Sequence, residues 1–272
     1  MRIAHFILTR FNLAFGSRPV DASWLGHRME LFRAFCAPSV VGQATRPFRW
    51  LIFVDPSTPD GCRREIERLA SPVGAVHEAL GLEPSAVVAL IRRHLEPEVT
   101  HVLTTSLDND DALASDFVAT LQAACTPRDF EVVNMRVGLR LILRTNRLYS
   151  CCLESNPFVS VLEEASRART VWQCLPHSTM SSRYRDIRSI DTKPMWMQVI
   201  HDRNVSNSGA WGLLRTQPSE LDRFRVSWTG SLDDGPIGFE NLVRRAERAL
   251  IRAVPTAARP GLRRLLDRRS WR

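Results

Sequence analysis

The chain has 272 residues, more than one ordinary domain and fewer than two, and its 44% hydrophobic and 24% charged residues are typical of a folded globular protein. It has no apolar run long enough to span a bilayer, and its N-terminus is too polar for a secretory signal. Its six cysteines form no C-x-x-C pair, which argues against disulfides and a structural zinc site. These features predict a cytoplasmic protein. The net charge of +8 equals that of residues 244–272 alone, where ten arginines accompany two acidic residues, so no diffuse nucleic-acid-binding surface is expected.

Hydrophobic periodicity predicts alternating strands and helices over the first 150 residues. Strands are expected at 2–8, 49–54, 75–79, 101–107, 130–134 and 139–145. Helices are expected at 24–35, stopping near Pro38, and at 62–70, 84–95 and 115–124, the last with Ser115 as its N-cap. This alternation predicts an α/β fold with an open, mostly parallel sheet and helices on both faces.

An acidic cluster, residues 108–111 in LTTSLDNDDAL, follows the expected strand 101–107. The carboxylates of Asp108, Asp110 and Asp111 repel one another, and a hard divalent cation such as Mg²⁺ or Mn²⁺ would relieve that repulsion. The alternative is an Asp-rich turn in which Asn109 or Asp111 caps a helix. Placement after an apolar strand in a β/α series favours the metal, because ligands bind beyond the carboxyl ends of such strands.

The motif LDNDD resembles the metal-binding Asp-x-Asp motif of GT-A glycosyltransferases, and WLIFVDPSTPD resembles the second-strand segment of their large inverting family. More specifically, the chain resembles a bacterial family of rhamnosyl transferases over about residues 2–207. The segments that carry this resemblance are FILTRFNL, LFRAFCAPSVVGQ, FRWLIFVDPSTP, VLTTSLDNDDAL, NPFVSVLE and WMQVIHDRNVSN. The family label says little about the sugar that is transferred.

This resemblance implies a GT-A-like domain over residues 1–230, with a nucleotide-sugar-binding half (1–150) and an acceptor-side half (151–230). It assigns the nucleotide to Thr9 and Arg10 and the base or ribose to Asp55. Asp108 and Asn109 would contact the donor, and Asp108, Asp110 and Asp111 would hold the metal. The alternative for Arg10 is that it forms only a surface ion pair. The alternative for Asp55 is that it only caps the STPD turn.

An inverting transfer also needs a general base to accept the proton of the acceptor hydroxyl. The resemblance implies a base well after the metal motif, in a window that contains Asp191, His201 and Asp202; Glu163 is a candidate outside it. The sequence lacks the Glu-Asp pair and Arg-x-x-Arg-Trp segment usual there. His201 is alternatively a further metal ligand or a structural histidine. Asn204 and Asn207 are candidates for binding substrate hydroxyls, and the alternative is that they only shape a turn. The candidates for stacking on a sugar ring are Trp172, Trp196 and Trp211, and the alternative for these is a place in the core.

Residues 231–272 are expected to form a basic, helical extension. Helical spacing places Leu242, Val243, Leu250, Ile251 and Val254 on one face, opposite Arg244, Arg245, Arg248 and Arg252. A basic amphipathic helix is typical of a membrane-surface element, and the alternative is a helix that packs back on the domain.

Together these observations predict a Mg²⁺- or Mn²⁺-dependent, inverting glycosyltransferase. It would move a sugar from a nucleotide-sugar donor to a glycan or lipid-linked acceptor, in the cytoplasm or at the inner face of the plasma membrane. Rhamnose is the sugar that the family label names. Two alternatives remain: a Mg²⁺-dependent nucleotidyltransferase, for which no glycine-rich phosphate loop is found, and a non-catalytic binding protein derived from a transferase.

Overall fold

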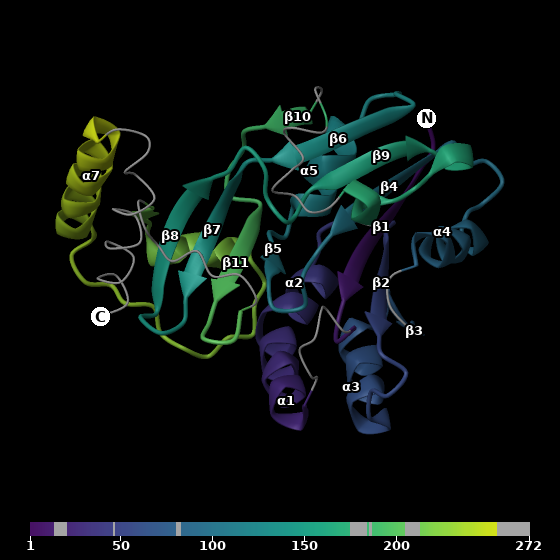
Figure 1. The fold of residues 1–272 in the computed structure, drawn as a ribbon, viewed down its shortest axis with the longest axis horizontal. Helices are drawn as coiled ribbons and strands as arrows, with labels where there is room; N and C mark the ends of the chain where they lie inside the picture. The colour runs from purple at the N-terminus through teal and green to yellow at the C-terminus, as the bar shows by residue number, and fades with distance from the viewer. Residues whose placement is uncertain are drawn as a thin grey trace.

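The protein is analysed as a computed structural model, which describes residues 1–13, 21–45, 47–79, 83–174, 184, 187–204 and 213–254. Within these residues the strands form two sheets (Figure 1). The strands are β1 (Ile3–Arg10), β2 (Arg49–Val54), β3 (Gly74–Glu78), β4 (His101–Ser106), β5 (Ala112–Leu113), β6 (Phe130–Met135), β7 (Val137–Ile142), β8 (Arg147–Cys152), β9 (Ser160–Glu164), β10 (Ile187–Ile190), β11 (Trp196–Ile200) and β12 (Leu214–Arg215). The α-helices are α1 (Ala22–Leu31), α2 (Ala37–Val41), α3 (Asp60–Ala70), α4 (Pro84–Arg93), α5 (Phe117–Ala124) and α7 (Ile237–Ala253).

The larger sheet has seven strands in the order β10-β6-β9-β4-β1-β2-β3, and only β9 runs antiparallel to its neighbours. Its central strands β1, β2 and β4 are buried over most of their length because both faces of the sheet are covered. Ile7 packs with Trp50 and Leu103 in one core, together with residues of α1, α3 and α5. Phe6 and Leu8 point to the opposite face and pack with residues of α4. The predicted mostly parallel sheet flanked by helices is therefore confirmed.

The smaller sheet has five strands in the order β12-β8-β7-β11-β5, and the sequence analysis did not predict it. β7, expected in the main sheet, instead pairs with β8 and β11 here. The predicted division at residue 150 does not follow the two sheets. It falls inside β8, and β9 and β10 return to the seven-stranded sheet. Short apolar runs do not reveal which sheet a strand joins, since that depends on pairing with distant strands.

The first helical segment continues past Pro38, where the sequence predicted a stop. A turn of π-helix, Phe32–Cys36, joins α1 to α2. Proline has no N–H to donate to the carbonyl four residues earlier. That carbonyl, on Ala34, instead accepts a hydrogen bond of 2.8 Å from the Ser227 amide. A segment far away in the sequence thus satisfies the group that Pro38 leaves open.

Two further local predictions are corrected. α5 begins at Phe117 after Asp116, and Ser115 does not cap it; the Ser115 amide donates to the Arg223 carbonyl at 2.8 Å. In α7, Arg244 is buried rather than on a solvated face, and Leu242 and Val243 are exposed. Figure 1 shows α7 beside β8, at the end of the molecule away from α4. Residues 255–272 lie outside the described part of the chain.

Candidate functional site

The acidic cluster lies at the topological switch point of the larger sheet. β1 pairs with β2 on one side and with β4 on the other, and all three run parallel. Arg10 ends β1, and Asp108 follows β4 on the next strand, so the two residues meet at the carboxyl edge. A crevice outside the carboxyl ends at such a point is where open α/β sheets bind their ligands.

Asp110 is the most heavily bonded carboxylate of the cluster. Its Oδ2 atom accepts hydrogen bonds from His201 Nε2 at 2.9 Å and from Asn204 Nδ2 at 3.4 Å, and it forms a buried ion pair with Arg28. Burial by itself raises the pKa of Asp110, but the hydrogen bond from His201 and the charge of Arg28 outweigh that effect and hold the pKa below its ordinary value. Asp110 is therefore an anion with its counter-charge built into the fold.

Asp111 ties the cluster to the smaller sheet. Its Oδ1 atom accepts a hydrogen bond of 2.8 Å from the Val199 amide of β11. Burial, followed by the charges of Asp110 and Asp108, raises the pKa of Asp111 well above its ordinary value. The chain continues from Asp111 into β5, so neither Asp111 nor Asn109 caps a helix. The turn that this alternative also supposed is present at residues 109 and 110.

Asp108 and Asn109 complete the cluster in different ways. Asp108 keeps solvent-exposed surface, although desolvation and then the charge of Asp110 raise its pKa, against opposing effects of Arg10 and Arg28. Asn109 is buried, donates to the Phe11 carbonyl at 2.6 Å and accepts from Arg28 Nη1 at 3.1 Å. Asp108 is thus the carboxylate of the cluster best placed to meet a ligand.

The predicted Mg²⁺ or Mn²⁺ ligand set is not assembled in this structure. His201 binds Asp110 through a hydrogen bond, but the same Asp110 oxygen is also held by Arg28 and Asn204, and Asp111 is turned toward β11. The three carboxylates therefore do not converge on one point. Among the described residues, the one group of three His, Cys, Asp or Glu side chains whose ligand atoms all lie within 4.8 Å of one another is His27, His201 and Asp202. The acidic cluster as arranged here does not fit a divalent cation.

Thr9 and Asp55, at the ends of β1 and β2, make local contacts. Thr9 is buried and its hydroxyl accepts a hydrogen bond of 2.9 Å from Trp50 Nε1, so that hydroxyl faces the core rather than a ligand. Asp55 Oδ1 accepts from the Ser57 amide at 2.8 Å and from the Ser57 hydroxyl at 2.5 Å. These bonds lower the pKa of Asp55. Asp55 therefore does cap the STPD turn. It also lies at the same edge of the sheet as Arg10.

Two of the four candidates for the general base lie away from the acidic cluster. Glu163 pairs with Val102 at the start of β4, at least about 13 Å along the strand from its end. The Glu163 carboxylate accepts hydrogen bonds from the Arg169 and Thr170 amides. Asp191 follows β10, about 14 Å or three strand spacings from β4, and pairs with Arg136. The structure brings neither carboxylate to the cluster.

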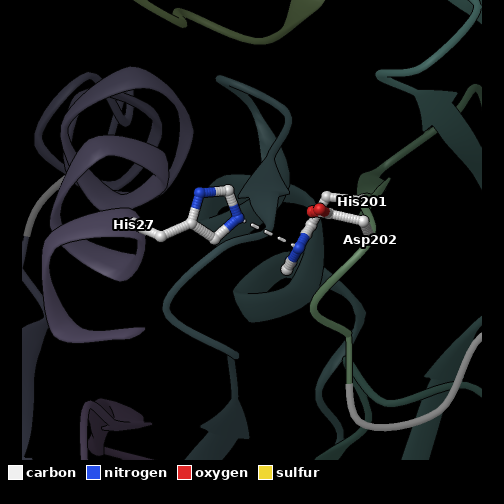
Figure 2. Close-up of side chains that lie close together, drawn as sticks. All are labelled: His27, His201 and Asp202. Carbon is white, nitrogen blue, oxygen red and sulfur yellow. Dashed lines mark hydrogen bonds between the residues drawn. The ribbon is translucent and has the colours of Figure 1, made fainter. Parts of the chain in front are cut away.

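His201 and Asp202, the other two candidates, follow β11 and lie beside the acidic cluster. Figure 2 shows His27 of α1 facing His201, with Asp202 next to them. His201 Nδ1 accepts a hydrogen bond of 3.2 Å from the Arg203 amide, so the ring proton lies on Nε2 and is donated to Asp110. His27 Nε2 lies 3.2 Å from the same Nδ1 atom. Burial, then the charges of His201 and Arg203, lower the pKa of His27.

The sequence analysis missed Arg28 and His27. Both lie in α1, which was predicted as an amphipathic helix. Leu25 and Met29 form its buried face, and Arg28 is buried beside them, only 6% exposed. An arginine on the apolar side of a helix was a usable signal, because a buried guanidinium needs an anion nearby. Of the other candidates, Asn204 does join the site and Trp196 packs in the core, whereas Asn207 and Trp211 lie outside the described residues.

Fold and site together define an α/β protein with a cluster of charged side chains at the switch point of its sheet. The chain belongs to the family described as putative rhamnosyl transferases, whose model matches residues 19–212, and is thereby classed with the glycosyltransferases. The match includes the acidic cluster, Arg28 and His201, and begins after Arg10. A comparison with curated proteins gives no match.

Several solved structures are similar to the chain at low sequence identity. TarS from S. aureus is 10% identical with a TM-score of 0.44 over 74% of this chain, and this chain spans 37% of TarS. TarS 1–349 in complex with UDP-GlcNAc is 11% identical with a TM-score of 0.43, covering 96% of this chain and 78% of that one. A putative nucleotide-diphospho-sugar transferase from Desulfovibrio desulfuricans G20 is 10% identical with a TM-score of 0.39, covering 72% and 82%.

Proposed function

We propose that the protein transfers a sugar from a nucleotide-sugar donor to a hydroxyl group of a glycan or lipid-linked acceptor, with inversion at the sugar carbon. The observation that carries this proposal is the charged cluster at the switch point between β1 and β4, in a chain of this family. Rhamnose is the sugar that the family description favours.

Cationic side chains are proposed to stabilise the diphosphate leaving group. Charge develops on the diphosphate as the glycosidic bond breaks, and fixed positive groups that face it lower the barrier. Arg10 is partly exposed at the end of β1, and its charge reaches Asp108. Arg28 donates hydrogen bonds to Asp110 and Asn109 and so fixes their positions. Asp108 and Asp55 are proposed to contact the donor, and no step is assigned to a metal at the acidic cluster.

Asp202 is the proposed general base. It is exposed, whereas His201 Nε2 already donates its proton to Asp110 and Asp191 and Glu163 lie elsewhere. An exposed carboxylate beside the acidic cluster is able to accept the proton of an acceptor hydroxyl as that oxygen attacks the sugar.

Contact with an anionic membrane through α7 and the arginine-rich residues after it is also proposed. Phe239, Leu242 and Val243 are 70%, 65% and 44% exposed, and Arg245 is exposed beside them. Exposed apolar groups among arginines match a surface of anionic lipid in both polarity and charge. None of the described helices combines the length and apolar character needed to cross a bilayer.

The test is donor binding followed by transfer. The melting temperature is measured with a panel of nucleoside diphosphates and nucleotide sugars, nucleotide-activated rhamnose included, in EDTA and again with Mn²⁺. A ligand that binds only the folded state raises the melting temperature. We expect one nucleotide to do so, Asp108→Asn to reduce the effect, and Asp191→Asn, the matched exposed carboxylate, to leave it unchanged. Release of nucleoside diphosphate and the product anomer then report transfer. No shift with any nucleotide and no release would overturn the proposal.

A further inference from the structure

Three metal-ligating side chains from two distant segments meet beside the acidic cluster: His27, His201 and Asp202, named here the histidine cluster (Figure 2). Their ligand atoms all lie within 4.8 Å of one another. His27 comes from α1, and the other two follow β11. The fold therefore brings the imidazole of His27 to two consecutive residues, His201 and Asp202, that lie far from it in the sequence.

The spacing of the two histidines fits a tetrahedral metal. His27 Nε2 and His201 Nδ1 lie 3.2 Å apart. Two nitrogen ligands about 2.0–2.1 Å from a tetrahedral Zn²⁺ are separated by about 3.3 Å. With Asp202 as the third ligand, one position of a tetrahedral ion stays open, and Asp202 is exposed to solvent.

Each histidine also has a carboxylate near its other ring nitrogen. His201 Nε2 donates to Asp110 Oδ2 at 2.9 Å. His27 Nδ1 lies 3.9 Å from Glu30 Oε2, one helical turn away. A metal-ligating histidine usually points its second nitrogen at such a group, which fixes the tautomer and strengthens the ligand. Asp110 leaves His201 with its lone pair on Nδ1, the atom that faces His27.

We propose that His27, His201 and Asp202 bind a divalent transition-metal cation of the zinc class. Imidazole nitrogen suits Zn²⁺ and its neighbours, whereas Mg²⁺ prefers oxygen ligands. Binding moves the His27 ring proton from Nε2 to Nδ1, toward Glu30, so no proton is released. The Arg203 amide gives up its 3.2 Å hydrogen bond to His201 Nδ1. That amide lies in the turn after β11.

This site goes beyond the proposed function and can be tested without a donor. Ligation occupies an oxygen of Asp202, the proposed base, so we expect bound Zn²⁺ to slow transfer. His27 has no part in the proposed chemistry, and a His27 variant therefore separates metal binding from transfer.

The experiment is a calorimetric titration of the EDTA-treated protein with ZnCl₂ alone, repeated with Co²⁺ and its visible absorption. We expect one equivalent to bind and His27→Ala and Asp202→Asn each to weaken binding at least tenfold. Glu30→Gln weakens it less, because it removes a neighbour of a ligand rather than a ligand. His101→Ala, a histidine at the far end of β4, is the matched control and leaves the affinity unchanged.

Two results would overturn the proposal: no Zn²⁺ binding by the wild-type chain, or binding that His27→Ala leaves intact. Circular dichroism confirms that each variant folds, and His27→Gln serves where the alanine variant does not. Nucleotide binding measured in EDTA is independent of this titration, so the two proposals fail separately.

Discussion

At the scale of single residues, Arg28 does for the acidic cluster what the sequence analysis assigned to a metal ion. Its guanidinium donates to Asp110 and Asn109 and lies 5.1 Å from the centre of the Trp24 ring. The Arg28 guanidinium of α1 is a cation that belongs to the chain itself, and it offsets the repulsion among the carboxylates. The sequence analysis predicted a divalent metal ion for this role, and the sequence could not show that α1 brings a guanidinium to the cluster.

Replacing Arg28 by methionine is expected to destabilise the fold by about 3 kcal/mol at pH 7, since it leaves a buried anion without its partner. The pKa of Asp110 is held below its ordinary value, so this stabilisation is present at neutral pH and is lost as the pH falls through the folded-state pKa. Urea unfolding at pH 7 and pH 3.5 measures both effects. Arg28→Lys, the control, retains part of the stability, and a methionine variant as stable as the wild type at pH 7 would contradict the prediction.

His5 gives a second prediction at this scale. It is buried in β1, its Nε2 lies 2.9 Å from the Thr105 hydroxyl, and burial lowers its pKa to about 3. As the pH falls, His5 therefore takes up a proton in the unfolded chain before it does so in the folded one. The contribution of His5 to the free energy of unfolding is complete above about pH 6.5 and is lost as the pH drops toward 3, by up to about 1.4 kcal/mol per pH unit. His5→Gln should flatten the pH dependence of the unfolding free energy between pH 6.5 and 4.5. The matched variant His101→Gln should retain the slope, and equal slopes in both variants would refute this account.

At the scale of elements, β11 connects the core to the site. Trp196 at its start stacks on Phe158 and donates to the Met135 carbonyl at 2.7 Å. Val199 near its end binds Asp111, and His201 follows it. The packing of one indole ring thus sets the position of the residues that end the strand.

Gly138 lies beside Trp196 in the paired strand β7, and a Cβ atom added there would overlap the indole ring. We expect Gly138→Ala to destabilise the protein by about 1–3 kcal/mol and to weaken ligand binding at the end of β11. Gly26→Ala is the matched control, because Gly26 is a helical glycine with nothing within 4 Å of the added atom, and it should be neutral or stabilising. Thermal unfolding of both variants measures the difference; similar melting temperatures would count against it.

Most helices and strands of the first half were predictable from the sequence, but the distant segments that they pair with were not. β2 matches its predicted range, and α4 begins where Pro84 indicated. These segments have strong local patterns of period 2 or 3.6, or a proline at a helix start. In contrast, the continuation through Pro38 depends on Ser227, and the placement of β7 depends on β11. Local patterns do not contain contacts between residues so far apart.

At the scale of the whole molecule, α7 attaches to the smaller sheet through polar contacts and leaves apolar side chains outside. Arg244 lies over the Tyr149 ring at 4.5 Å, and Glu240 accepts from the Tyr149 hydroxyl at 2.9 Å. Buried Arg215 pairs with Glu240 and Asp233. Because charged side chains attach α7 to the smaller sheet, Phe239 and Leu242 stay exposed and are able to contact another surface.

We expect the protein to sediment with vesicles of anionic phospholipid and not with vesicles of neutral phosphatidylcholine. Phe239→Ser with Leu242→Ser should weaken this binding because it removes the apolar contact, and high salt should weaken it by screening the arginines. The double variant is expected to keep its melting temperature, since both side chains are exposed. Equal binding to both kinds of vesicle, or no effect of the substitutions, would contradict the proposed membrane contact.

The sequence by itself determined the α/β class, the acidic cluster after an apolar strand, and the family resemblance, because each is written in short contiguous segments. Only the tertiary structure decided that Arg28 neutralises Asp110, that Glu163 and Asp191 stand apart, and that His27 meets His201. Those relations join residues that are many positions apart, and they exist only once α1, β4 and β11 have packed against one another.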